Sequence, residues 1–141
     1  MNTLNLTLLL QIAGGLHAGL LLAGASMPKA VNLHQNLATL PKFVRRLFYV
    51  YFGFIGMILL GFGILTFCFA GAMAAGQPVG RGLCVLMAVF WVVRLAVAAF
   101  VFDVRPYLTN WLYRMGNIAL NLVFIYLVMV YVIAALKGGH L

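Results

Sequence analysis

Four long apolar stretches constrain this chain more than any other feature of its sequence. They cover residues 4–27, 47–75, 83–102 and 115–136, and each reaches the roughly 20 residues that a helix needs to cross about 30 Å of hydrocarbon. Their apolar residues run continuously instead of alternating, and so few segments cannot close a membrane barrel. The sequence therefore predicts an all-α integral membrane protein, a four-helix transmembrane bundle that forms a single domain over residues 1–141.

The composition agrees with a lipid environment. Hydrophobic residues make up 66% of the chain and charged residues 7%, against about 45–50% and about 25% in soluble proteins. The first residues lack the positively charged segment that opens a signal peptide, so we expect the first stretch to stay in the membrane. We predict a multi-pass protein of a bacterial inner membrane or an equivalent membrane, with membrane lipids as its surroundings.

The basic residues predict the orientation, because positively charged connections stay in the cytoplasm. Six of them lie in the connections after the first and third stretches: Lys29, Lys42, Arg45, Arg46, Arg105 and Arg114. Arg81 and Lys137 lie on the other side, so we expect both termini to be extracytoplasmic. Long apolar runs separate these bases, so they form no nucleic-acid patch and we expect no nucleic-acid partner.

Arg94 is the one base inside an apolar stretch. It precedes the end of the third stretch by eight residues, which is roughly 12 Å along a helix. A charge at that depth costs at least about 2.5–3.5 kcal/mol, so it needs a partner. The only acidic residue, Asp103, is roughly 13 Å away along the axis, and we expect it to pair with Arg105 or Arg114 instead.

Polar residues in the other stretches are candidates for meeting Arg94. Asn117 and Asn121 are four residues apart and share a helix face, and His17 is near the middle of the first stretch. We predict a ligand- or partner-binding pocket of Arg94, Asn117, Asn121 and His17, facing small residues that leave space in the second stretch. Those small residues are Gly53, Gly56 and Gly63. The alternative is that these polar groups only hydrogen-bond the bundle together.

A ridge of small residues in the first stretch predicts a close helix contact. Gly15, Gly19 and Ala23 follow one another at four-residue spacing, which lets helices approach closely in membranes. His17 points roughly opposite this ridge, at about 100° per residue. If the ridge packs inside the bundle, His17 faces lipid or a partner; if the ridge docks a partner, His17 faces inward.

The side chains needed for most kinds of catalysis are missing from the sequence. One acidic residue cannot form a carboxylate pair for acid–base chemistry or a site for a hard metal ion. The two cysteines, Cys68 and Cys84, lack the spacing of a metal or redox pair. His17 is the only histidine at membrane depth, whereas bis-histidine haem needs two. We therefore predict no catalytic residues, no metal and no cofactor.

These observations favour a non-catalytic membrane component, an accessory or scaffold subunit that packs against another integral membrane protein or against itself. A homo-oligomeric channel, or an anion or lipid carrier lined by Arg94, is the first alternative. A quinone- or haem-associated anchor of a redox enzyme, with one contact from His17, is the second.

Overall fold

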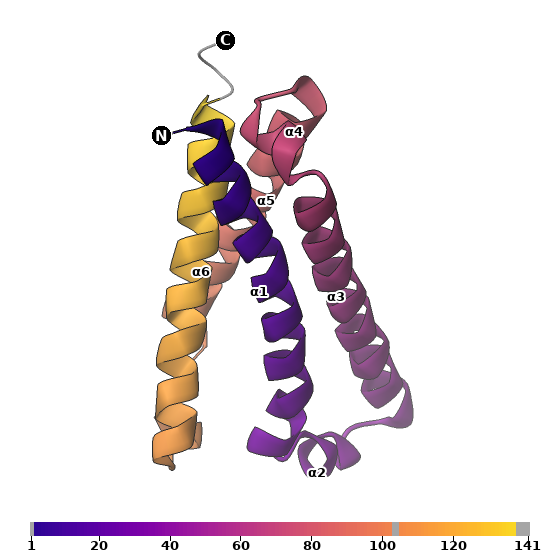
Figure 1. Ribbon diagram of the computed structural model, residues 1–141. Helices are drawn as coiled ribbons and strands as arrows, with labels where there is room; N and C mark the ends of the chain where they lie inside the picture. The colour runs from indigo at the N-terminus through magenta and orange to yellow at the C-terminus, as the bar shows by residue number, and fades with distance from the viewer. Residues whose placement is uncertain (1, 103–104, 138–141) are drawn as a thin grey trace.

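The computed structural model describes residues 2–102 and 105–137 and is all-helical (Figure 1), with helix over 89% of the chain and no strand in those described ranges. Four helices are long and apolar enough to span a membrane: α1 (Thr3–Ala30), α3 (Lys42–Cys68), α5 (Pro78–Phe100) and α6 (Trp111–Lys137). Three short helices join them: α2 (Leu33–Ala38), α4 (Ala70–Ala74) and the 3₁₀ turn η1 (Arg105–Tyr107). Of the long helices, α5 is the shortest, with 23 residues against 27 or 28.

The helix ends differ from the ends of the apolar stretches in two ways. The helices begin earlier, because α3 starts directly after Pro41 and α5 starts at Pro78, and proline suits a helix start while it stops a preceding helix. The second stretch, 47–75, is not one helix, since the chain leaves the α-helix at Phe69 (φ −106°, ψ 18°) and continues as α4. Gly76 then takes a positive φ of 74°, which glycine adopts without strain, and turns the chain into α5.

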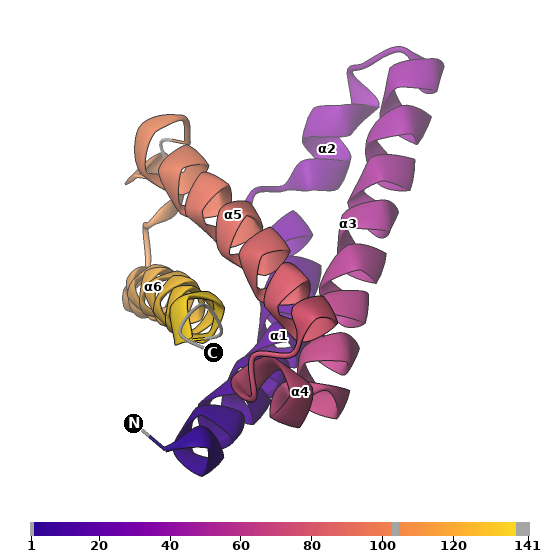
Figure 2. The ribbon, with the colours of Figure 1, turned by 90° about the horizontal axis from the view of Figure 1, so that it is seen from above.

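The two ends of the bundle are different in kind. The beginning of α1, the end of α6 and the α4 turn share one end, and α2 lies at the opposite end (Figure 1). α1 occupies the centre, packing on α3, α4 and α6, while α5 packs mainly on α6. Seen from above, the end of α3 and the start of α5 lie together at α4, and the two helices diverge toward the other end (Figure 2).

This divergence confines the core to one half of the molecule. We call residues 3–20, 63–91 and 124–137 the packed half, because it holds the buried core side chains of all four long helices, such as Leu10, Met87 and Leu127. We call residues 21–62 and the described part of 92–123 the open half. Within it, only Leu33 and Leu37 of α2 are buried.

Close contact between α1 and α3 depends on Gly14 and Gly63. A Cβ atom at Gly14 would lie 3.0 Å from the Gly63 carbonyl oxygen, and one at Gly63 would lie 2.9 Å from the Cβ of His17. The predicted ridge does not make this contact, because Gly15 and Gly19 have no such neighbour within 4 Å. The contact face is centred one residue earlier than the ridge, which turns His17 inward.

The other predicted packing positions lie outside the close contact. Ala23 is half-buried, Gly53 has open space at its Cβ position, and Gly56 meets only the end of the Leu21 side chain, at 3.9 Å. Of the glycines predicted in the second stretch, only Gly63 touches another helix closely, because α1 and α3 separate toward the open half.

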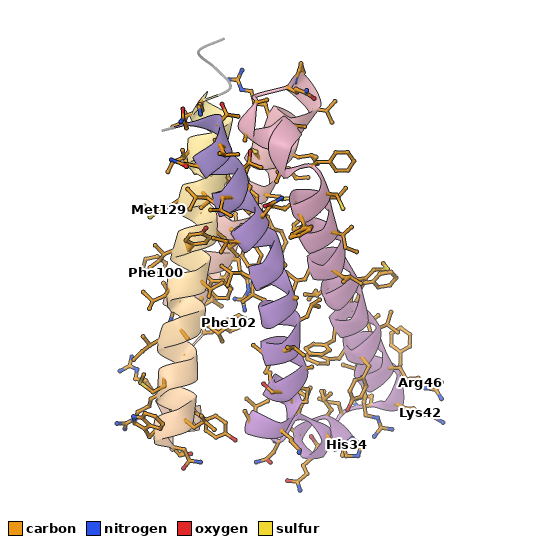
Figure 3. All side chains as sticks on the ribbon, viewed as in Figure 1. His34, Lys42, Arg46, Phe100, Phe102 and Met129 are labelled. Carbon is orange, nitrogen blue, oxygen red and sulfur yellow. The ribbon has the colours of Figure 1, made fainter. Side chains whose placement is uncertain are left out.

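The basic side chains concentrate at the α2 end. Lys42 and Arg46 extend from the start of α3, beside His34 of α2 (Figure 3). The short helix α2 is amphipathic: Leu33 and Leu37 are buried, while its polar residues are exposed. A bond of 3.4 Å between His34 Nδ1 and the Tyr49 hydroxyl links α2 to α3. This end of the molecule thus combines positive charge with a surface helix.

Candidate functional site

His17 is the polar residue at the centre of the bundle. It is fully buried, and its Nδ1 lies 2.7 Å from the Ala13 carbonyl oxygen one turn earlier. Because a carbonyl can only accept, Nδ1 carries the proton, and in a neutral imidazole Nε2 is then an acceptor. Nε2 has no hydrogen-bond partner. The ring is held firmly by its own helix and leaves one acceptor unused.

Aromatic side chains surround His17 and form a layer across the middle of the bundle. The His17 ring lies 5.3 Å from Trp91, 6.3 Å from Tyr131 and 6.4 Å from Phe62, all in edge contacts. Further edge and stacking contacts connect the layer from α3 through α5 to α6. We call the set the mid-bundle aromatic layer; its members are His17, Phe62, Phe90, Trp91 and Phe124. All four long helices contribute to it, and it closes the packed half.

Arg94 lies directly beyond this layer, in the open half. Its guanidinium carbon is 5.2 Å from the ring centre of Phe124 and 5.8 Å from that of Phe102. These cation–π contacts stabilise the charge by about 0.5–2 kcal/mol each, depending on how dry the site is. The Nη1 atom is buried and has no hydrogen-bond partner. The aromatic rings therefore cover the cation without neutralising it.

The depth of Arg94 follows from the helix that it touches. Phe124 is the central residue of α6 (Trp111–Lys137), so it lies roughly 20 Å from either end of that helix. Phe100 and Phe102 accordingly lie beside the middle of α6, away from the end that carries His34, Lys42 and Arg46 (Figure 3). Arg94 is thus deeper than its position in the sequence indicated, because the short helix α5 ends partway along α6.

The structure does not join the four predicted pocket residues into one hydrogen-bonded site. Asn121 donates to the Asn117 carbonyl oxygen at 3.0 Å, within its own helix, and Phe124 occupies the place on α6 that faces Arg94. His17 connects to Arg94 only through the aromatic layer. Gly53 and Gly56 lie on α3 where it separates from α1, and among the described residues their only neighbour from another helix within 4 Å is Leu21, beside Gly56. Asn121 and Phe124 are three residues apart on the same face of α6, so the difference is one of position along the helix: the Phe124 ring contacts Arg94, while the Asn121 amide bonds its own helix.

The predicted partner of the other bases lies outside the described residues, because Asp103 is in the segment 103–104. Arg114 donates from Nε to the Leu108 carbonyl oxygen at 3.3 Å. This bond holds the start of α6 against the preceding connection.

A hydroxyl cluster in the packed half was missed by sequence reasoning. The hydroxyls of Thr66 and Tyr131 are 2.6 Å apart, and Thr66 also donates to the Met87 sulfur at 3.3 Å. Tyr126 donates to the Leu9 carbonyl oxygen at 2.9 Å. These bonds connect α3, α5, α6 and α1. The only signal in the sequence is a hydroxyl within an apolar run, which predicts a bond but not its partner.

Among the described residues, three buried nitrogens without partners mark the boundary between the halves: His17 Nε2, Trp91 Nε1 and Arg94 Nη1. Such a group costs about 1–3 kcal/mol when nothing satisfies it. In a neutral His17 the first is an acceptor, whereas the other two only donate. The donor of greatest chemical consequence is Arg94, because its charge attracts an anionic acceptor such as a carboxylate or a phosphate.

Comparison with models of protein families, with curated proteins and with solved structures found no match for this chain. The interpretation of the site therefore rests on its residues and their geometry.

Proposed function

We propose that this chain is a multi-pass membrane protein with both termini on the extracytoplasmic side, and that it acts as a non-catalytic accessory or scaffold subunit of a larger membrane complex. Support for the membrane comes from the four long apolar helices. Support for the orientation comes from the α2 end, which carries Lys29, Lys42, Arg45 and Arg46, since basic connections remain cytoplasmic.

The observation that carries the proposed role is the unneutralised Arg94 in the middle of the bundle. Its charge is covered by Phe102 and Phe124, and Nη1 lacks an acceptor. The chain contains a single acidic residue, Asp103, so it offers few means of neutralising the charge itself. A carboxylate from a neighbouring membrane protein would supply the missing acceptor and could bind the guanidinium with two hydrogen bonds.

Depth favours a protein carboxylate over a lipid phosphate. Phosphates lie at the membrane surface, whereas Arg94 packs against the residue at the centre of α6. An acidic residue on a transmembrane helix can lie at any depth, and such intramembrane charges pair with one another. In the open half α3 and α5 diverge (Figure 2), and Arg94 keeps part of its side chain exposed there, where a neighbouring helix could reach it.

The test is purification from native membranes in a mild detergent, followed by measurement of subunit stoichiometry. We expect a fixed ratio to a second membrane protein that carries an intramembrane acid, and loss of that protein in Arg94→Leu. Exchanging the charges, with Arg94→Glu here and the acid changed to Arg in the partner, should restore the complex. Arg81→Gln, which removes an exposed charge at the other end, is the matched control.

Two results would overturn the proposal. One is a wild-type protein that is monodisperse and alone apart from lipid and detergent. The other is a complex that keeps its stoichiometry when Arg94 becomes Leu while circular dichroism shows an unchanged helix content.

A channel, or an anion or lipid carrier, is the second candidate, and the basic α2 end of the open half favours it. Positive charge at the mouth of a pathway concentrates anions, and Arg94 would line the route. This function predicts that Arg94→Ala abolishes anion flux into liposomes, while the variant keeps its oligomeric state. Unchanged anion flux in the Arg94→Ala variant would rule out this second candidate function.

A quinone- or haem-associated anchor is the third candidate. The bond from His17 Nδ1 to a backbone carbonyl is the arrangement that orients ligating histidines. The absorption spectrum of the protein purified from native membranes tests this function, which requires a haem or quinone signal that is lost in His17→Ala.

A further inference from the structure

A groove of about 280 Å³ runs along the outer side of the contact between α1 and α3. Small residues of α1, including Gly15 and Ala18, form one wall, and apolar side chains of α3, including Leu60, Ile64 and Phe67, form the other. Gly15 and Ala18 are exposed, as are these three α3 residues. The groove is too small for a helix, which is about 10 Å across with its side chains. Its width and its apolar walls suit a hydrocarbon chain.

The groove begins at the depth where acyl chains end. Leu59, at its lower edge, is 13 residues beyond Arg46, a distance of about 20 Å along α3. Half the hydrocarbon thickness is about 15 Å, and the headgroup region adds roughly 5–7 Å. With Arg46 at the headgroups, the Leu59 edge of the groove therefore lies near the membrane midplane, and the far edge at Cys68, nine residues further along α3, lies about 13 Å past it.

The space between the groove and the basic end is also open. Leu21 and Gly56 approach each other at 3.9 Å, but the next facing glycines, Gly24 and Gly53, have no neighbour within 4 Å of their Cβ positions. An acyl chain lying along this side of α1 and α3 would therefore pass the Leu21 side chain at Gly56 and two glycines whose Cβ positions are open.

The start of α3 provides the charge that selects a headgroup. Lys42 and Arg46 are exposed and Arg45 is half-buried, all within the first turns of the helix. Exposed His34 of α2 is bonded to Tyr49 of α3, which keeps α2 beside them. Anionic headgroups gain about fivefold in affinity from each Lys or Arg near the membrane surface.

We propose that this side of the protein binds one anionic phospholipid, with its phosphate among Lys42, Arg45 and Arg46 and the end of one acyl chain entering the groove at its Leu59 edge. Charge complementarity selects the headgroup, and the distance from Arg46 to that edge, which matches the length of an acyl chain, orients the lipid. The site is separate from Arg94; it rests on the proposed membrane location and not on the proposed subunit role.

The test uses the full chain in nanodiscs that contain phosphatidylglycerol and phosphatidylcholine, with native mass spectrometry of the released protein. We expect phosphatidylglycerol to be retained in preference. Changing Lys42, Arg45 and Arg46 together to Gln should reduce its binding by about 100-fold, at about fivefold per charge. Arg81→Gln, at the opposite end, is the control and should leave the preference unchanged.

A second variant tests the acyl chain independently of charge. Gly15→Leu places a side chain in the groove, and no protein atom lies within 4 Å of the new Cβ, so the fold should persist. Gly82→Leu, an exposed glycine of α5 that is equally free of neighbours and lies outside the groove, is the control. We expect loss of retained lipid in the first variant and not in the second.

The location is read from a phosphatidylglycerol that carries a photoreactive diazirine near the end of its acyl chain. Crosslinks should fall on peptides that contain Gly15–Leu21 and Leu59–Cys68. Equal retention of both lipids, unchanged retention in the triple variant, or crosslinks elsewhere would each overturn the proposal. Circular dichroism of every variant separates loss of binding from loss of fold.

Discussion

The packed half and the open half of this protein consist of the same four helices, yet they differ in almost every contact. In the packed half, α1 buries Leu6, Leu10 and His17, and all four helices meet in a continuous core. In the open half, α3 and α5 separate, and large apolar side chains are exposed; Phe100, for example, is 89% exposed. Most of the basic residues also lie in this half. The packed half therefore holds the helices together, whereas the open half exposes apolar and basic side chains.

The difference teaches how little of a membrane bundle has to be packed. Lipid is as apolar as leucine, so an exposed apolar side chain carries no penalty there and helix association depends on close packing and hydrogen bonds. The hydroxyl contact between Thr66 and Tyr131 and the Gly14–Gly63 approach both lie in the packed half. The open half therefore needs no packed core, and it can expose apolar side chains and hold a charge such as Arg94.

The two tryptophans provide the strongest test of the difference in packing between the halves. Trp91 is 1% exposed in the packed half, whereas Trp111 is 75% exposed in the open half. We expect Trp91→Ala to lower the free energy of unfolding by about 3–5 kcal/mol, because it leaves a large cavity. Trp111→Ala should change it by less than about 0.5 kcal/mol. Reversible unfolding in mixed micelles measures both, and equal losses would show that the core is not confined to one half.

Two glycines of α3 give the next largest contrast. A Cβ atom at Gly63 would lie 2.9 Å from the Cβ of His17, whereas one at Gly53 meets nothing within 4 Å. We expect Gly63→Leu to force α1 and α3 apart at a cost of about 1–3 kcal/mol. Gly53→Leu should be nearly neutral. Distances between spin labels on α1 and α3 would detect the separation, and an unchanged distance in Gly63→Leu would contradict the observed approach.

The boundary between the halves can be tested through Arg94. Replacing an unpaired charge with a leucine removes its desolvation penalty but also its contacts with Phe102 and Phe124. We expect Arg94→Leu to raise the free energy of unfolding of the isolated chain by about 1 kcal/mol. A loss of more than about 1 kcal/mol in the same micelle measurement would show that the charge is already satisfied within the chain.

The smallest expected effect concerns the buried hydroxyls. Thr66→Val removes the contacts with Tyr131 and Met87, and hydrogen bonds between transmembrane helices contribute about 0.6 kcal/mol on average. Thr39, which is exposed in the open half and bonds only its own segment, is the matched position. Thr39→Val should leave the free energy of unfolding unchanged. A double-mutant cycle of Thr66→Val with Tyr131→Phe should give a coupling energy of similar size.

Much of the architecture could be predicted from the sequence because the apolar runs are long and proline or glycine separates them. The four long helices are the clearest case, and the short surface helix before Pro41 fits a connection of that length. The end of α3 at Phe69 could not be predicted, because no proline or glycine marks it. The break depends on how α4 packs its Ala70, Met73 and Ala74 against the bundle.

The rotation of each helix was harder to predict than its position. In a soluble helix the polar face marks the outside, but here both lipid and core are apolar, so α1 and α6 have little contrast between their faces. For this reason the sequence could not choose between Gly14 and Gly15 as the contact, nor decide whether His17 faces inward. The contact of Arg94 with Phe124 depends on how far α5 extends along α6, which the apolar pattern does not specify.

The unequal lengths of the helices have a consequence for the choice of membrane. At about 1.5 Å per residue, α5 measures about 35 Å and its neighbours about 40 Å or more. A thin bilayer would match α5 and leave the longer helices to tilt, whereas a thick one would have to thin around α5, at a fraction of a kcal/mol per ångström. We therefore expect the angle at which α3 and α5 diverge to change with bilayer thickness, and with it the response of the protein to the acyl-chain length of its surroundings.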